Sequence, residues 1–283
     1  MTTPALSHKI DRPEIRNLLL RISHDAIDVV IYSVVEDNSL IYHRLELDTT
    51  SSSRLSAIQN VIYDHPAILS DFRRVYCVLE TRDYAIVPAL CRHPGQQKML
   101  FDAAFPGNRL EMTADETGLN NATVLCGIEP DLRGFINRTF QRVSTVSHIA
   151  ALCRYAGMNA THGNKRKMIA NVRRNSLDVV VTDGHRLLLA NTFTYERPDD
   201  AVYYLLSTRQ RLGLDPRNDE IILAVDHDSR EELTQTLRNF VARVMPVIFP
   251  PQMFKAGKDA MLAPQSFVMS VSGPHVNHDR RQG

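Results

Sequence analysis

Glycine, tryptophan and long apolar runs are scarce in this sequence. Glycine accounts for 12 of the 283 residues, about 4% where about 7% is usual, and tryptophan is absent. Loops that cradle phosphate need several residues without a Cβ, so the deficit argues against a glycine-rich phosphate loop. No apolar run approaches the roughly 20 residues of a membrane-spanning helix, and residues 1–17 lack the apolar core of a secretory signal. We therefore expect a cytoplasmic protein with no membrane span.

The charges are balanced, and the cysteines are few. The chain has 33 Lys and Arg against 32 Asp and Glu, a net charge of +1, which leaves no overall field to hold nucleic acid or an anionic membrane. The cysteines are Cys77, Cys91, Cys126 and Cys153. No pair has the CxxC spacing of zinc or thioredoxin-type sites, so we expect reduced, buried thiols and no metal. Apolar residues make up 43% of the chain, enough for a sizeable core.

The first half of the chain predicts a meander, a helix and a return strand. In order, we expect strands at residues 17–23, 26–35 and 40–47, a helix at 51–69, a strand at 73–80 and a helix at 88–105. The strand at 73–80 is short and strongly apolar, as is typical of the centre of a mixed sheet. A connector follows, for which we expect a strand at 122–128 and helices at 131–140 and 143–156.

The second half repeats the pattern of the first. The segment Asp25–Tyr32 (DAIDVVIY) matches Asn175–Thr182 (NSLDVVVT) at an offset of 150 residues. We expect strands at residues 168–174, 177–183 and 186–195, a helix at 199–214, a strand at 220–226 and a helix at 229–244. Five elements in the same order and spacing indicate an internal duplication.

Three antiparallel strands, a helix, a parallel strand and a helix make a ribonuclease-H-like unit, and two such units in tandem make the actin-like ATPase fold. We therefore predict an α/β protein with duplicated lobes. The first lobe, with the connector strand, covers residues 15–140 and the second covers 141–272. Residues 1–14 and 273–283 are expected to be flexible tails.

The chain also resembles a bacterial family of proteins of unknown function whose structural relatives have an actin-like fold. Three stretches carry the resemblance: NLLLRISHDAIDVVIYS, VYCVLETRDYAIVPALC, and VLCGIEPDLRGFINRTF with STVSHIAALCR. They cover most of the chain, from about Asn17 to Pro250. The connector is also similar to that of actin-like proteins in pilus-assembly and type II secretion machines.

The resemblance implies a nucleotide site between the lobes, but the phosphate turns depart from the family pattern. Working members have an acidic residue near the end of the first strand of each lobe, followed by Gly with Ser or Thr. Here the candidate turns are Ser23, His24 and Asp25 in the first lobe, and Arg173, Arg174 and Asn175 in the second. Neither contains glycine, and the second has no acid. The nearest match to the adenine loop is Ser272-Gly273-Pro274, with a single glycine. ATP and magnesium are therefore not expected as cofactors.

Other chemistries have weaker support. A ribonuclease-H-type nuclease needs clustered carboxylates around two metals. Asp28 and its counterpart Asp178 lie out of phase with the apolar residues of their strands, so we expect both to face solvent or a backbone group. The one basic cluster, residues 163–167 with Arg173 and Arg174, predicts a solvated loop and strand end, or else an anion or nucleic-acid contact.

The sequence thus favours a non-catalytic binding or assembly module, a pseudo-ATPase with a degenerate nucleotide site and an unidentified protein partner. The alternative is an ATPase or kinase that uses the inter-lobe cleft unconventionally. A nucleic-acid binder is the third and least favoured reading.

Overall fold

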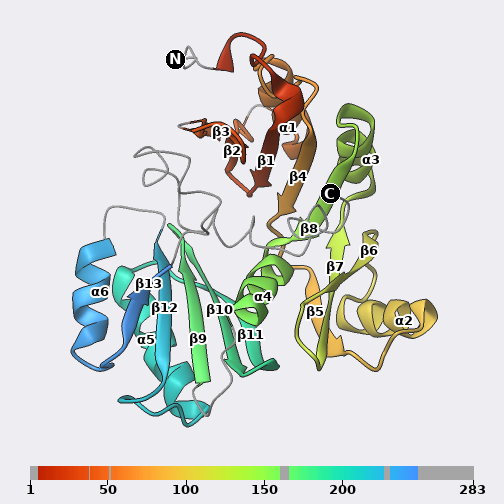
Figure 1. Cartoon of the computed structure of the whole chain (residues 1–283). Helices are drawn as coiled ribbons and strands as arrows, with labels where there is room; N and C mark the ends of the chain where they lie inside the picture. Colours follow the sequence, from red (N-terminus) through yellow and green to blue (C-terminus); the bar gives the residue numbers. More distant parts are fainter. Residues whose placement is uncertain (1–5, 38, 51, 160–165, 226–229, 248–283) are drawn as a thin grey trace.

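The computed structural model describes residues 6–37, 39–50, 52–159, 166–225 and 230–247. These residues form two five-stranded sheets and one three-stranded sheet. The two large sheets lie one above the other in Figure 1, with helix α4 between them and the small sheet with helix α2 to one side. Within the described residues, no helix has the length and apolar character needed to cross a bilayer.

The first large sheet has the strand order β3-β2-β1-β4-β8. Its strands are β1 (Arg16–Ile22), β2 (Ala26–Ser33), β3 (Ile41–Glu46), β4 (Arg74–Leu79) and β8 (Val143–Ser147). The strands β1 to β3 form the antiparallel meander expected from the sequence, and β4 lies between two parallel neighbours as expected. Helices α1 (Arg54–Tyr63) and α3 (Pro130–Thr139) pack on its outer face. We call this sheet with α1 and α3 the first lobe.

The second large sheet has the equivalent order, β11-β10-β9-β12-β13. Its strands are β9 (Arg166–Val172), β10 (Ser176–Asp183), β11 (Arg186–Thr194), β12 (Glu220–Val225) and β13 (Val244–Pro246). Helices α5 (Pro198–Arg211) and α6 (Arg230–Arg238) pack on its outer face and complete the second lobe. Leu18 pairs with Ile31 in the first sheet, and Met168 pairs with Val181 in the second. A shift of 150 residues therefore maps the first hairpin onto the second without a change of register.

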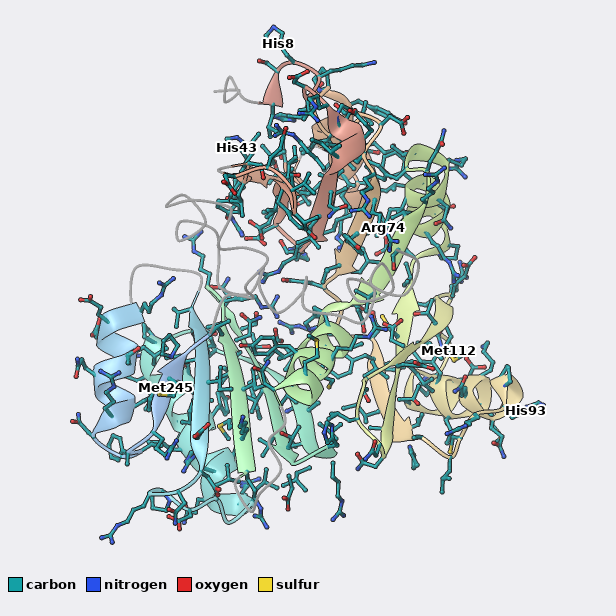
Figure 2. All side chains as sticks on the ribbon, in the orientation of Figure 1. His8, His43, Arg74, His93, Met112 and Met245 are labelled. Carbon is teal, nitrogen blue, oxygen red and sulfur yellow. The ribbon has the colours of Figure 1, made fainter. Side chains whose placement is uncertain are left out.

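A small third sheet extends from the first lobe. It consists of β5 (Tyr84–Pro88), β6 (Glu111–Glu116) and β7 (Ala122–Ile128) in the order β5-β7-β6, and it packs against α2 (Pro94–Ala104). Residue His93, labelled in Figure 2, caps the outer end of α2 and accepts a hydrogen bond from Gly95 N. The segment at 122–128, expected as a connector strand, is thus the centre of a separate antiparallel sheet.

Helix α4 (His148–Met158) fills the space between the inner faces of the two large sheets. Nine of its eleven residues are buried, and its side chains share one core with Leu19 and Val30 of the first sheet and Ile169 and Val180 of the second. Both faces of the central strands are therefore covered, which explains why β2 is buried along its whole length.

Two expectations about boundaries are corrected by this arrangement. Residues 143–147 form strand β8 beside β4, so the helix expected at 143–156 begins five residues later and the first sheet continues past residue 140. Residues 6–14 do not form a free tail, because Leu6 is fully buried in the core of the first lobe. The rest of the expected tails, residues 1–5 and 273–283, lies outside the described residues, as does the end of the expected second lobe from residue 248.

Candidate functional site

The two turns singled out from the sequence line one cleft of about 1000 Å³. The first turn joins β1 to β2 through Ser23, His24 and Asp25, and the second joins β9 to β10 through Arg173, Arg174 and Asn175. All six residues line the cleft, together with residues from the ends of β4 and β7 and from the start of α4. The structure therefore brings the predicted site residues together from both lobes.

The backbone of the two turns follows the same hydrogen-bonding pattern. Ser23 N donates to Ala26 O at 2.9 Å, and Arg173 N donates to Ser176 O at 2.8 Å. The Ala26 amide in turn donates to the Ser23 hydroxyl at 3.0 Å. An amide that is engaged within its own turn does not point toward a bound phosphate, so these contacts reduce the capacity of the turns to cradle one.

A row of alternating charges links the two lobes, and Arg21, Glu80 and Arg173 of this row line the cleft. Arg21 Nε donates to Glu80 Oε1 at 2.5 Å, and Arg173 Nη1 donates to Glu80 Oε2. Glu80 directly follows β4 of the first lobe, whereas Arg173 follows β9 of the second. Each arginine also faces an aspartate of its own sheet, since Arg21 Nη1 lies 4.0 Å from Asp28 Oδ2 and Arg173 Nη2 lies 2.9 Å from Asp178 Oδ1. We call these five residues the charge ladder, and it joins the two lobes.

Asp178 is the most enclosed member of the charge ladder. It is 1% exposed and also accepts hydrogen bonds from Asn171 Nδ2 at 3.0 Å and from Thr192 Oγ1 at 2.9 Å, with His148 Nε2 at 3.4 Å. Burial acts to raise the pKa of this carboxyl, but the Arg173 guanidinium and the other donors outweigh it and hold the pKa well below its usual range. Asp178 is therefore a permanent negative charge at neutral pH.

The other end of the ladder reaches the mouth of the cleft. Arg44 Nη1 lies 3.4 Å from Asp28 Oδ1, and Arg44 Nη2 lies 3.1 Å from Asp25 Oδ2. Burial acts to raise the pKa of Asp25, but the Ser23 hydroxyl and the Arg44 charge leave it lowered. The same carboxylates raise the pKa of Arg44 against the opposing effect of burial. Asp25 therefore already has a cationic partner within the protein, the guanidinium of Arg44.

Asp28 and Asp178 were expected to face solvent or a backbone group, and the expectation of solvent is wrong. They are 4% and 1% exposed, and both lie on the faces of their sheets that point toward α4 and the opposite lobe. Side chains alternate between the two faces of a strand, and this alternation correctly placed both aspartates on the face away from the outer core of their lobe. It could not show that a second buried layer covers that opposite face.

The carboxylates of the cleft do not form a nuclease-type metal site. Among the described residues, no group of three or more His, Cys, Asp or Glu side chains is placed to hold a metal ion. Asp28, Glu80 and Asp178 are each held by arginine.

The described members of the predicted basic cluster lie at the two ends of one strand. Lys167 lies at the start of β9, where its Nζ donates to Asn159 O at 2.5 Å, while Arg173 and Arg174 lie beyond the other end of that strand. Residues 160–165, and the candidate adenine loop at 272–274, lie outside the described residues. The described part of the cluster therefore offers no continuous surface for a nucleic-acid backbone.

Three of the four cysteines are buried as the sequence predicts, and Cys91 is not. All four are free, and Cys77, Cys126 and Cys153 are buried, whereas Cys91 is partly exposed. Burial raises the pKa of each of the three buried thiols to about 12.

Comparison with known proteins agrees with this architecture. Residues 7–244 match the model of a family described as "Protein of unknown function (DUF3822)". The chain belongs to this family. No curated protein sequence matches it.

This family member is similar to several solved structures. One is a protein from Bacteroides thetaiotaomicron with an actin-like ATPase fold and unknown function, at 24% identity and a TM-score of 0.72, covering 92% of this chain and 99% of the other. Another is from a PilM–PilN type IV pilus biogenesis complex, at 11% identity and a TM-score of 0.58, covering 92% and 98%. A weaker likeness, at 12% identity and a TM-score of 0.47, is to the cytoplasmic domain of EpsL, an inner membrane component of the type II secretion system of Vibrio cholerae, covering 87% and 94%. The actin-like ATPase fold expected from the sequence is confirmed.

Sequence reasoning missed the residues that link the lobes. The sequence pattern places Glu80 only at the end of an expected strand and His148 only within an expected helix, and it assigns no role to Arg21. One signal was available, because Arg21 and Asp28 sit symmetrically about the first turn and face each other in the register of β1 and β2. Nothing in the sequence indicated the contact between Glu80 and Arg173, which are 93 residues apart.

Proposed function

We propose that this protein is a non-catalytic actin-like module, which binds a protein partner and uses its own ion pairs where a working ATPase would hold nucleotide phosphates and metal. One observation carries the proposal: the carboxylate of Glu80 lies between Arg21 and Arg173 at the place where the two turns approach each other. A carboxylate here supplies the negative charge that a phosphate would otherwise bring. The two lobes can then pack against each other without a bound nucleotide between them.

The chemistry of the turns supports the same proposal. Neither turn contains glycine, and the first amide of each is engaged within the turn. Asp25, the acid nearest to the position where the fold family has its metal-binding carboxylate, is paired with Arg44. Metal-dependent phosphate chemistry would have to break these contacts first.

The proposed partner class is protein. One structural relative comes from a complex of PilM with PilN, which motivates the expectation that this actin-like chain also serves in an assembly. The identity of the partner and the oligomeric state do not follow from the fold. The cytoplasmic location expected from the sequence stays a prediction, as does the origin of the two lobes by duplication, which their common register supports.

Binding of Mg-ATP to the full-length chain, measured by isothermal titration calorimetry, tests the proposal. We expect no saturable, magnesium-dependent heat at nucleotide concentrations up to the millimolar range. Tight magnesium-dependent binding would overturn the proposal, provided that a Ser23→Ala, Asp25→Asn double variant loses the binding while it keeps the wild-type circular dichroism spectrum.

The alternative, an enzyme that binds nucleotide in the cleft, has one observation in its favour. The cleft is large enough for a nucleotide, and its lining includes Arg82 and Arg174 in addition to arginines that pair with carboxylates, such as Arg54 with Glu129. It predicts a thermal shift with Mg-ATP that Arg174→Gln removes. Turnover of ATP by the wild-type chain, lost in the same variant, would establish this alternative.

A further inference from the structure

Two of the six arginines that line the inter-lobe cleft take no part in its ion pairs. The other four are paired with carboxylates: Arg21, Arg44, Arg54 and Arg173. Arg82 and Arg174 form no ion pair or side-chain hydrogen bond with any residue that the structure describes. Both are exposed, so they stand where the cleft meets solvent and are accessible to a ligand.

The two unpaired arginines come from different lobes but lie close to one contact. Arg82 follows Glu80 by two residues beyond the end of β4, and Arg174 directly follows Arg173 beyond the end of β9. Glu80 and Arg173 are in contact across the lobe boundary. Two residues of extended chain span at most about 7 Å, so this contact brings the segments that carry Arg82 and Arg174 together. One extended ligand can therefore reach both guanidinium groups.

The first turn adds a third basic side chain. His24 also lines the cleft and is exposed, and it lies 150 residues before Arg174, at the equivalent position of the other lobe. A neutral imidazole still has one N–H donor, so His24 can donate a hydrogen bond to an anion at pH 7. We call Arg82, Arg174 and His24 the basic rim.

One carboxylate of the lining, that of Asp83, is adjacent to the basic rim in sequence. Among the described residues it forms no ion pair with Arg82 or Arg174. Burial raises the pKa of the Cys126 thiol to about 12, and the charges of Asp115 and Asp83 act in the same direction, so Asp83 lies within electrostatic range of the third sheet. Its backbone carbonyl accepts a hydrogen bond from Gly127 N of that sheet at 2.7 Å. Asp83 therefore does not neutralise the basic rim at contact distance.

We propose that the basic rim binds an acidic segment of the protein partner, an extended peptide with successive Asp or Glu side chains. The inference rests on the proposed function, because it names the chemistry by which that partner is recognised. Guanidinium groups bind carboxylates through paired hydrogen bonds. A peptide is favoured over a nucleotide because the first amide of each turn is engaged within the turn and Asp25 is paired with Arg44. Carboxylates of a peptide need only the side chains of the basic rim.

A labelled hexaglutamate peptide, titrated with the full-length chain and followed by fluorescence anisotropy, tests the proposal. We expect saturable binding at low salt that weakens as the ionic strength rises, because exposed ion pairs are screened. Hexalysine, of the same length and opposite charge, should not bind. The absence of saturable hexaglutamate binding would overturn the proposal, and so would equally tight binding of the two peptides.

Substitutions in the basic rim locate the bound peptide. Arg82→Gln and Arg174→Gln should each weaken binding by about two- to fivefold, and the double variant by about tenfold, as expected for exposed ion pairs. Arg211→Gln removes the same charge from the exposed surface of α5, on the outer face of the second lobe, and should leave the affinity unchanged. Circular dichroism checks that each variant folds. An effect of Arg211→Gln as large as that of Arg82→Gln would show non-specific attraction and overturn the proposal.

Competition with Mg-ATP at matched ionic strength separates this inference from the proposed function. We expect the fraction of bound hexaglutamate to stay unchanged. Displacement of the peptide by micromolar Mg-ATP would overturn both, because the cleft would then prefer a nucleotide. If neither ligand binds, the inference fails while the proposed non-catalytic function stands. A single-stranded oligothymidylate that binds more tightly than hexaglutamate would overturn the inference in favour of nucleic acid.

Discussion

Glu80 of the first lobe accepts hydrogen bonds from Arg21 of its own lobe and from Arg173 of the other. Its side chain is 10% exposed, so water contributes little to its solvation. The carboxylate is therefore a counter-ion shared by two guanidinium groups that would otherwise repel each other across the lobe boundary.

Glu80→Gln should be strongly destabilising. Loss of the charge leaves two nearly buried guanidinium groups without their shared counter-ion, which costs about 3 kcal/mol. Urea unfolding at pH 7 measures the change. Glu111→Gln is the matched control, because the exposed pair of Glu111 with Arg133 contributes less than about 1 kcal/mol. Equal effects of the two substitutions would show that the central position of Glu80 has no special importance.

Asp178 should make the stability of the chain depend on pH in acid. Its pKa is lowered in the folded state, so its contribution is fully present above the unfolded value of about 4 and is lost as the pH falls toward the folded pKa. Asp178→Asn should be less stable than wild type at pH 7, and the difference should shrink as the pH falls below 4. Unfolding free energies at pH 7 and pH 3 test this. Asp37→Asn, at an exposed position, controls for the change in net charge.

The native chain should expose one reactive thiol. The pKa values of about 12 keep Cys77, Cys126 and Cys153 protonated and buried, so a chromogenic disulfide reagent at pH 8 should modify only Cys91 rapidly. All four cysteines should react in denaturant. Cys91→Ser should abolish the fast phase, and a fast phase that persists in this variant would mean that the core opens more readily than its packing indicates.

Asn121 should control local opening of β11. Its side chain accepts a hydrogen bond from Leu187 N at 2.8 Å and donates one to Leu187 O at 3.0 Å. It thereby satisfies both backbone groups of Leu187 on the edge strand β11, as a neighbouring strand would. Asn121→Ala should speed hydrogen exchange of the Leu187 amide and lower stability by about 1 kcal/mol. Asn121→Asp keeps the acceptor for Leu187 N, so exchange at that amide should be slower than in the alanine variant.

Two helical glycines should respond oppositely to alanine. A Cβ on Gly157 of α4 would lie 2.9 Å from the Gly118 carbonyl oxygen, a backbone atom that cannot easily move, so Gly157→Ala should destabilise by about 1–3 kcal/mol. For a Cβ on Gly134 of α3, the three nearest atoms all belong to the Arg138 guanidinium, the far end of a flexible side chain. Gly134→Ala should therefore be neutral, or stabilise by up to about 1 kcal/mol through helix propensity. Thermal unfolding of both variants tests the contrast.

Local pattern was enough to predict most of the fold. The β-branched composition of residues 26–35 and 177–183, and the repeat between these segments, predicted two meanders with return strands, and both meanders have the same register. The strands β5, β6, β8 and β13 escaped prediction. They are short, and β8 is recognisable mainly by its pairing with β4, since its residues Val143–Ser147 run directly into the apolar pattern of α4.

The sequence by itself determined which residues form the two turns, that both turns lack glycine, and that the lobes repeat. The tertiary structure alone decided what those turns face. Helix α4 lies between the sheets and buries Asp28 and Asp178 on faces that the alternation of apolar residues along the strands does not mark as buried. The packing of the lobes also brings Glu80 into contact with Arg173. Periodicity reports one buried face of an element, because it reflects only local spacing. A second buried face and an ion pair across 93 residues depend on how whole lobes pack.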